Sequence, residues 1–201
     1  MVTHYIHRGL AKKNFKENTL LSFRYSFKKK YGIETDIHST KDDQLICFHD
    51  FSLSKFKISK KIKNVDYSYI KKISIRKKTE VPLLEDLLKV CKNKYPILLE
   101  IKPLFKYRNL KSLIRMLKKS KKYRIISFKE KNLINLYKLN KKLPLGLLFT
   151  STASLKKIKI KSKKKYVKFL VLEKKFLSSK RLSSIKKNIY YYTIKNKNLF
   201  Q

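Results

Sequence analysis

Cysteine, glycine, alanine and acidic residues are all scarce in this chain of 201 residues. The two cysteines, Cys47 and Cys91, have no metal-ligand or disulfide spacing, which excludes a disulfide framework and favours a reducing cytoplasm. The longest apolar runs, such as Leu145–Phe149, are far too short to span a bilayer. The N-terminus shows no basic and apolar leader, so no secretory signal is predicted. These absences predict a cytoplasmic protein without a transmembrane segment.

Positive charge is the most abundant feature of the chain, with 53 Lys and Arg against 13 Asp and Glu and a net charge of +40. Such a surface attracts anions, including phosphoesters, nucleic acids and acidic membranes. However, only seven of these residues are Arg, whose planar fork contacts bases and phosphates in bidentate fashion. Lys is spread through every segment, Trp is absent, and Ala occurs only at positions 11 and 153, as A+T-rich codons favour. We therefore predict no specific nucleic-acid partner, with a polycationic nucleic-acid or anionic-membrane binding protein as an alternative.

Alternation of apolar strands and amphipathic helices predicts an α/β fold with parallel strands. The length favours one domain over residues 1–201. The expected strands are 2–8, the first arm of a hairpin at 33–50, 97–102, 124–128, 145–149, 169–173 and 189–194. A first helix is expected to begin near residue 19. Further helices are expected at 66–73, 83–94, 109–119, 131–141 and 177–187, with a weaker segment at 155–160.

Seven parallel strands fall one short of a closed barrel. A (β/α)₈ barrel needs eight strands and usually about 250 residues. We therefore predict a TIM-type (β/α) barrel that is incomplete, with its eighth strand missing. An open barrel exposes two strand edges, and a homo-oligomer is one way to close it.

The stretch Tyr31–Asp50 is predicted to form a β-hairpin around a polar turn. If Asp42 and Asp43 form a two-residue loop, Asp36 lies opposite His49 and His38 lies opposite Cys47. Side chains two residues apart on a strand share a face. Glu34 and Asp36 are therefore expected to project on the same side as His49. Like charges held together repel unless a cation or proton intervenes, so this patch calls for a ligand.

Polar residues gather at the ends of the predicted strands, where active sites of barrel folds lie. Glu100 follows Ile97-Leu98-Leu99 in a strand expected to be buried, where an unpaired carboxylate is costly. Together with Glu34 and Asp36 it makes three carboxylates, which suit a hard divalent cation such as Mg²⁺ or Ca²⁺.

The remaining polar residues supply bases and positive charge. His7 and His49 suit acid and base catalysis near neutral pH. Arg8 and Lys102 provide positive charge for a phosphate. A zinc-like cluster of His38 and Cys47 with Asp36 and His49 is an alternative, although the carboxylates favour a harder ion.

These residues stand in an order that resembles the glycerophosphodiester phosphodiesterase family. The matching pieces are His7-Arg8-Gly9, Glu17-Asn18-Thr19, Glu34-Thr35-Asp36, Thr40-Lys41-Asp42, His49-Asp50, Val81-Pro82-Leu83-Leu84-Glu85, Glu100-Ile101-Lys102, Ser127-Phe128 and Tyr192-Thr193-Ile194. A single triplet is a weak signal, but the ordered set covers nearly the whole chain.

The resemblance implies a metal-dependent phosphodiesterase on a (β/α)₈ scaffold. By position, it implies that Glu34, Asp36 and Glu100 hold the Mg²⁺ or Ca²⁺ ion and that His7 and His49 form the acid and base pair. Arg8 and Lys102 are implied to bind the phosphate oxygens of a small glycerophosphodiester. The products are then glycerol 3-phosphate and an alcohol such as choline or ethanolamine.

The chain departs from the family pattern at several points. Asp43 stands where the family usually has Gly, and Lys55 replaces the usual Arg. The glycine-containing loop after His49-Asp50 and the eighth strand with its Gly-Val-Asp and Thr-Asp landmarks are absent. A catalytically impaired remnant of the fold is therefore a second alternative.

Overall fold

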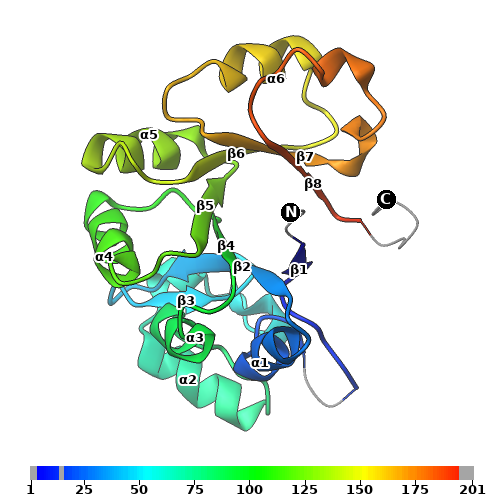
Figure 1. Ribbon diagram of the computed structural model, residues 1–201. Coiled ribbons are helices and arrows are strands. Elements are labelled where there is room, and N and C mark those ends of the chain that lie inside the picture. Colours follow the sequence, from blue (N-terminus) through cyan, green and yellow to red (C-terminus); the bar gives the residue numbers. More distant parts are fainter. Residues whose placement is uncertain (1–3, 14–15, 195–201) are drawn as a thin grey trace. The chain divides into compact units, whose positions relative to one another are not determined.

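A computed structural model describes residues 4–13 and 16–194 of the chain. The chain divides into two compact units, residues 1–124 and 125–201. Both contain parallel strands with connecting helices (Figure 1). No helix of the described residues is long and apolar enough to cross a membrane.

The first unit is arranged around strand β2 (Gly32–Ser39). Strand β2 pairs in parallel with β1 (Tyr5–His7) and β4 (Ile97–Ile101), and antiparallel with β3 (Leu45–Cys47). The helices of this unit are α1 (Leu20–Lys28), α2 (Tyr67–Arg76), α3 (Leu84–Cys91) and α4 (Tyr107–Leu117), with short 3₁₀ helices at Leu53–Phe56 and Ile62–Asn64.

Helix α1 begins where the sequence indicates. Thr19 is its N-cap and forms a capping box with Ser22, in which each side chain accepts from the other residue's backbone N–H at 3.2 Å. The buried face of the helix carries Phe23 and Phe27, whereas Leu21 is exposed. Capping therefore sets the start of the helix, and the aromatic face sets its orientation.

The hairpin forms, but the predicted register is wrong by one residue. His38 lies opposite Ile46, and Ile37 lies opposite Cys47. The loop contains three residues instead of two, because Thr40 bonds back to Gln44 (N to O, 3.0 Å) and leaves residues 41–43 outside the ladder. Asp43 has a φ of 60°, the left-handed position that ends a three-residue hairpin loop.

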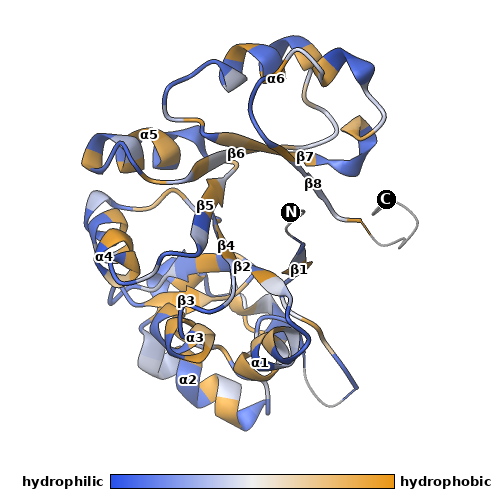
Figure 2. Ribbon diagram, in the orientation of Figure 1, coloured by the Kyte–Doolittle hydropathy of each residue, from blue (hydrophilic) through white to orange (hydrophobic). Residues whose placement is uncertain are grey.

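A buried apolar cluster fills the space beneath the hairpin. It consists of Ile46, Phe48, Leu53, Phe56, Ile62, Val65, Ile70, Ile73 and Val81. Most of these residues come from β3, helix α2 and the lysine-rich connection between them, and Val81 follows helix α2. Their burial holds this polar segment in place. Figure 2 shows the helices with both apolar and polar residues, as expected for elements packed on one face.

The second unit contains four parallel strands in sequence order. These are β5 (Tyr123–Ser127, which begins at the boundary), β6 (Leu145–Phe149), β7 (Phe169–Glu173) and β8 (Ile189–Tyr192). Helices α5 (Glu130–Leu139) and α6 (Leu155–Ser162) connect the first three. With β1, β2 and β4, the described residues contain the seven parallel strands that the sequence predicts.

The helix predicted at 177–187 is wrong. This connection forms only two single-turn 3₁₀ helices, Lys174–Phe176 and Lys180–Leu182. Two pairs of neighbouring serines and few apolar residues at helical spacing leave little to stabilise a longer helix. The predicted residues 2 and 3 of the first strand lie outside the described residues.

Candidate active site and metal centre

Three carboxylates that are far apart in the sequence meet on adjacent strands of the first unit. Asp36 of β2 lies directly beside Glu100 of β4, and Glu34 lies two residues earlier on β2. One carboxylate oxygen from each lies within 4.8 Å of the other two. All three residues are buried, with Asp36 only 1% exposed. Among the described residues, this is the group whose spacing fits a metal ion.

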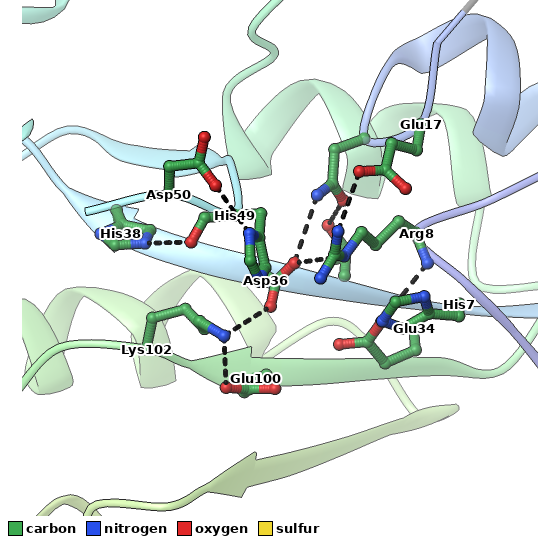
Figure 3. A network of polar contacts seen from close by, with 12 residues as sticks. His7, Arg8, Glu17, Glu34, Asp36, His38, His49, Asp50, Glu100 and Lys102 are labelled. Carbon is green, nitrogen blue, oxygen red and sulfur yellow. Dashed lines mark hydrogen bonds and ion pairs between the residues drawn. The ribbon is translucent and has the colours of Figure 1, made fainter. Parts of the chain in front are cut away.

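Two cations lie against this acidic cluster (Figure 3). Lys102 Nζ is 3.4 Å from Asp36 Oδ1 and 3.2 Å from Glu100 Oε1. Arg8 Nε is 3.2 Å from Asp36 Oδ2, and its Nη1 is 2.9 Å from Glu17 Oε1. Asp36 is thus the centre of the network, with a cation on each of its oxygens.

Asn18 and Thr35 complete the surroundings of Asp36. Asn18 Nδ2 donates to Asp36 Oδ2 at 3.3 Å, and Thr35 Oγ1 donates to Asn18 Oδ1 at 2.7 Å. Asn18 is buried with a φ of 55°, a conformation that Asn tolerates better than most residues. Sequence reasoning placed Asn18 only at a helix start. Its position in the Glu17-Asn18-Thr19 match was the signal available.

Burial and mutual repulsion act strongly on two of the carboxyl groups. Burial, followed by the charges of Asp36 and Glu100, raises the pKa of Glu34 well above its usual value. Burial and the charge of Asp36 raise the pKa of Glu100 to about 7, although Lys102 acts in the opposite direction. Arg8 and Lys102 therefore do not fully offset the burial and mutual repulsion of these carboxyl groups.

The acidic cluster passes a chemical test for a bound cation. The buried Oε1 of Glu100 accepts no hydrogen bond from the described residues, because the approach of Lys102 at 3.2 Å lacks hydrogen-bond geometry. A buried acceptor without a donor is costly, and a hard divalent cation takes oxygen ligands of this kind. Glu34, Asp36 and Glu100 therefore fit such an ion.

His7 contacts this cluster, and the side chains of His7 and His49 are both partly exposed. His7 Nε2 is 4.0 Å from Glu34 Oε2, and the backbone N–H of Arg8 donates to the same oxygen at 3.3 Å. Burial, followed by the charge of Arg8, lowers the pKa of His7, which favours its neutral form. His49 Nδ1 is 2.7 Å from Asp50 Oδ1. Because a carboxylate can only accept, Nδ1 carries a proton in this contact.

Neither of the further residues considered for zinc belongs to a metal cluster in the described part of the chain. His38 Nε2 contacts the carbonyl oxygen of His49 at 3.2 Å. Cys47 pairs with Ile37, so it projects to the opposite face from Asp36. Burial raises the pKa of the Cys47 thiol to about 12, which disfavours the thiolate that zinc requires.

Comparison with known proteins agrees with this geometry. The sequence model of the glycerophosphoryl diester phosphodiesterase family matches residues 7–196. No curated protein matches the chain. Among solved structures, a glycerophosphodiester phosphodiesterase from Thermotoga maritima is 20% identical, with a TM-score of 0.82 over 98% of this chain and 87% of that one. A phosphodiesterase from Oleispira antarctica, solved with the product sn-glycerol-3-phosphate, is 19% identical with the same TM-score and coverage.

A third structure, a glycerophosphodiester phosphodiesterase from Parabacteroides distasonis, is 21% identical with a TM-score of 0.80 over 97% of this chain and 85% of that one. These similarities confirm the predicted fold, an incomplete TIM-type (β/α) barrel with an additional strand on β2. The family match extends across almost all of the described chain, including every residue of the acidic cluster and both cations beside it. The chain therefore belongs to the glycerophosphoryl diester phosphodiesterase family.

Proposed function

We propose that this protein hydrolyses glycerophosphodiesters to glycerol 3-phosphate and an alcohol, using a divalent cation and two histidines. The observation that carries the proposal is the buried group of Glu34, Asp36 and Glu100, whose oxygens lie within 4.8 Å of one another. The family supports a phosphodiester substrate. The Oleispira antarctica relative, solved with sn-glycerol-3-phosphate, supports the glycerol side of that substrate.

The acidic cluster is proposed to hold Mg²⁺ or Ca²⁺, both of which take oxygen ligands. When bound, such an ion neutralises the charge that grows on a reacting phosphoryl group. The carboxylates are held for this role by their neighbours, since Arg8 and Asn18 both contact Oδ2 of Asp36. Lys102, which lies between Asp36 and Glu100, offsets part of their repulsion.

Arg8 and Lys102 are the proposed contacts of the substrate phosphate. Both side chains are mostly buried beside the acidic cluster, with exposed fractions of 17% and 15%. Burial lowers the pKa of Lys102, but the charges of Glu100 and Asp36 outweigh it and raise that pKa overall. Lys102 therefore stays protonated and offers a permanent positive charge to phosphate oxygens.

His7 and His49 are the proposed base and acid. One removes the proton from the attacking hydroxyl, which is water or the 2-hydroxyl of the glycerol, and the other protonates the departing alcohol. His49 is oriented by Asp50, which holds the proton on Nδ1 and stabilises the charged ring. The lowered pKa of His7 suits it to accepting a proton near neutral pH.

The test is release of glycerol 3-phosphate from glycerophosphocholine by the purified chain, with Mg²⁺ or Ca²⁺ present. We expect turnover that ceases with a chelator, and a loss of about 100-fold or more in His7→Asn and His49→Asn. Glu85→Gln is the matched control, because Glu85 pairs with Lys89 on the exposed face of helix α3. A folded protein without turnover under either ion would contradict the proposal and favour an impaired remnant.

The cytoplasmic location and the homo-oligomer stay proposals. Both cysteines are buried and free, which supports a reducing compartment such as the cytoplasm. A homo-oligomer is tested by sedimentation of the purified chain over a range of concentrations.

A further inference from the structure

The main chain of His49 leaves the sheet just before the histidine. Strand β3 ends at Cys47, and the last backbone bond to β2 is from Phe48 N–H to the carbonyl oxygen of Asp36 at 3.0 Å. Strands β1 and β3 pair with the same edge of β2, and β4 pairs with the opposite edge. At Glu34 the shared edge is already paired with His7 of β1. Ladder bonds from β2 therefore cannot hold the residue that carries the proposed catalytic ring.

His38 supplies the missing contact. It lies on β2 two residues after Asp36, so its ring projects on the same face as the acidic cluster. Its Nε2 lies 3.2 Å from the carbonyl oxygen of His49 (Figure 3). Because a carbonyl oxygen can only accept, Nε2 carries the proton and donates it.

The environment of His38 suits a fixed donor. The residue is 2% exposed, and its ring stands edge-on to Phe51 with centroids 5.3 Å apart. The described contacts give this histidine no bond to the acidic cluster itself.

His49 is thus held at two points. Asp50 holds the ring through Nδ1 at 2.7 Å, and His38 holds the main chain through the carbonyl oxygen. The first contact limits rotation of the ring, whereas the second limits where the whole residue stands.

We propose that His38 is a positioning residue for the hydrolysis, acting through its Nε2–H bond to the carbonyl oxygen of His49. The inference rests on the proposed function, in which His49 transfers a proton. A displacement of about 1 Å at a reacting group can reduce turnover by about 100-fold. His38 therefore affects the chemical step and leaves substrate binding to other residues.

Two variants separate the hydrogen bond from the packing. His38→Phe keeps a flat ring against Phe51 but has no donor, whereas His38→Gln keeps an N–H of similar reach. We expect His38→Phe to lower kcat by about 10- to 100-fold with KM nearly unchanged, and His38→Gln to recover most of the loss. Phe51→Leu, which alters the packing alone, is the matched control and should change kcat little. A rise in KM with unchanged kcat, or no recovery by Gln, would overturn the inference.

A double-mutant cycle tests whether the effect passes through His49. Residual turnover in a His49→Ala background is measured with a glycerophosphodiester that has p-nitrophenol as its leaving group. We expect His38→Phe to cause no further loss in that background, because the residue it positions is absent. The same fold-loss in both backgrounds would show that His38 supports the fold or the acidic cluster generally, which would contradict the proposal.

A structural readout keeps this inference separate from the proposed function. If the wild-type chain shows no turnover, the proposed function fails, but the contact is still measurable by NMR of the imidazole groups. His38→Phe should then shift and broaden the ring signals of His49 while leaving those of His7 in place. Unchanged His49 signals would overturn the positioning role on their own.

Discussion

Three of the 13 acidic residues of the chain are buried together, although the chain contains 53 basic residues. Such burial disfavours the charged form of each carboxylate, and Arg8 and Lys102 are the permanent cations that contact the group among the described residues. The arrangement therefore opposes folding unless something else neutralises it, and a divalent cation is the chemistry that fits. This reasoning makes separate predictions for the stability and for the metal response of the protein.

Replacing Glu100 by Gln should separate these two effects. The substitution removes repulsion from the buried cluster, so the metal-free variant should melt at the same temperature as the wild type or above it. The same variant should lose most of the rise in melting temperature that Mg²⁺ or Ca²⁺ gives to the wild type. Thermal unfolding with and without each ion measures both, and Glu85→Gln should respond like the wild type.

The pH dependence of the metal-free protein should follow the raised pKa of Glu100. Its folded-state pKa of about 7 lies above the ordinary value of 4.5, so the folded protein binds the proton more tightly than the unfolded chain. The stabilisation is complete below about pH 4.5 and is lost as the pH rises through 7. Glu34, whose pKa is also raised, acts in the same direction.

Cation binding should consequently release protons. At pH 6.5 much of Glu100 is protonated, so a bound cation must displace that proton, whereas at pH 8.5 Glu100 has little left to release. Isothermal titration in two buffers of different ionisation enthalpy should therefore show a larger difference in heat between the buffers at pH 6.5 than at pH 8.5. Heats that do not depend on the buffer at pH 6.5 would contradict the raised pKa.

Residue-level prediction from the sequence succeeded where polar residues interrupt apolar strands. Glu100 was found because a carboxylate after Ile97-Leu98-Leu99 is costly in a buried strand. Asn18, Thr35 and the His38 contact were missed. Each depends on a hydrogen bond between residues that are far apart in the sequence, and the spacing of residues within one segment does not predict such a bond.

Elements were predicted best where their pattern is local. The strands Leu145–Phe149 and Phe169–Glu173 have the predicted bounds, because each is a continuous apolar run. The hairpin register was wrong because the loop length depends on one backbone angle, the positive φ of Asp43. The helix expected at 177–187 was wrong because its serines are weak helix formers and its few apolar residues do not stabilise a long helix.

Asp43 should contribute more to the stability of the fold than an ordinary loop residue does. Its carboxylate contacts Arg108 Nε at 2.7 Å and Asn109 Nδ2 at 2.9 Å, which joins the hairpin loop to the start of helix α4. Asp43→Ala loses both contacts and places Ala at positive φ, so we expect roughly 1–2 kcal/mol of destabilisation. Asp43→Asn keeps the tolerated φ and an acceptor, and should cost clearly less. Chemical denaturation measures both, and an equal cost would contradict the role of φ.

Gly146 should resist substitution for a packing reason. A Cβ at this position would overlap the ring of Phe169 on the neighbouring strand. Gly146→Ala should therefore destabilise the protein by about 1–3 kcal/mol. Gly146→Ala combined with Phe169→Leu should recover part of that loss. Denaturant unfolding of the single and double variants decides, and a neutral single variant would contradict the close packing.

At the scale of the whole molecule, the charge of +40 governs long-range attraction, whereas three carboxylates govern the proposed chemistry. The sequence predicted the order of seven parallel strands and the family, because both depend on short motifs in a fixed order. The single domain over residues 1–201 and the homo-oligomer stay predictions.

Nucleic acid binding should be strong at low salt and without preference. Scattered Lys neutralises phosphates but reads no bases, so affinity should fall steeply and equally with salt for two unrelated DNA duplexes. Fluorescence anisotropy at several salt concentrations measures this. A preference for one duplex that persists at high salt would favour the nucleic-acid alternative.

Mn²⁺ binding, measured by the loss of the free-ion EPR signal, tests the acidic cluster most directly. The account predicts about one Mn²⁺ per wild-type chain, and loss of this binding in Glu34→Gln and in Asp36→Asn but not in Glu85→Gln. A folded wild type that binds no ion, or binding that survives both substitutions, would contradict it.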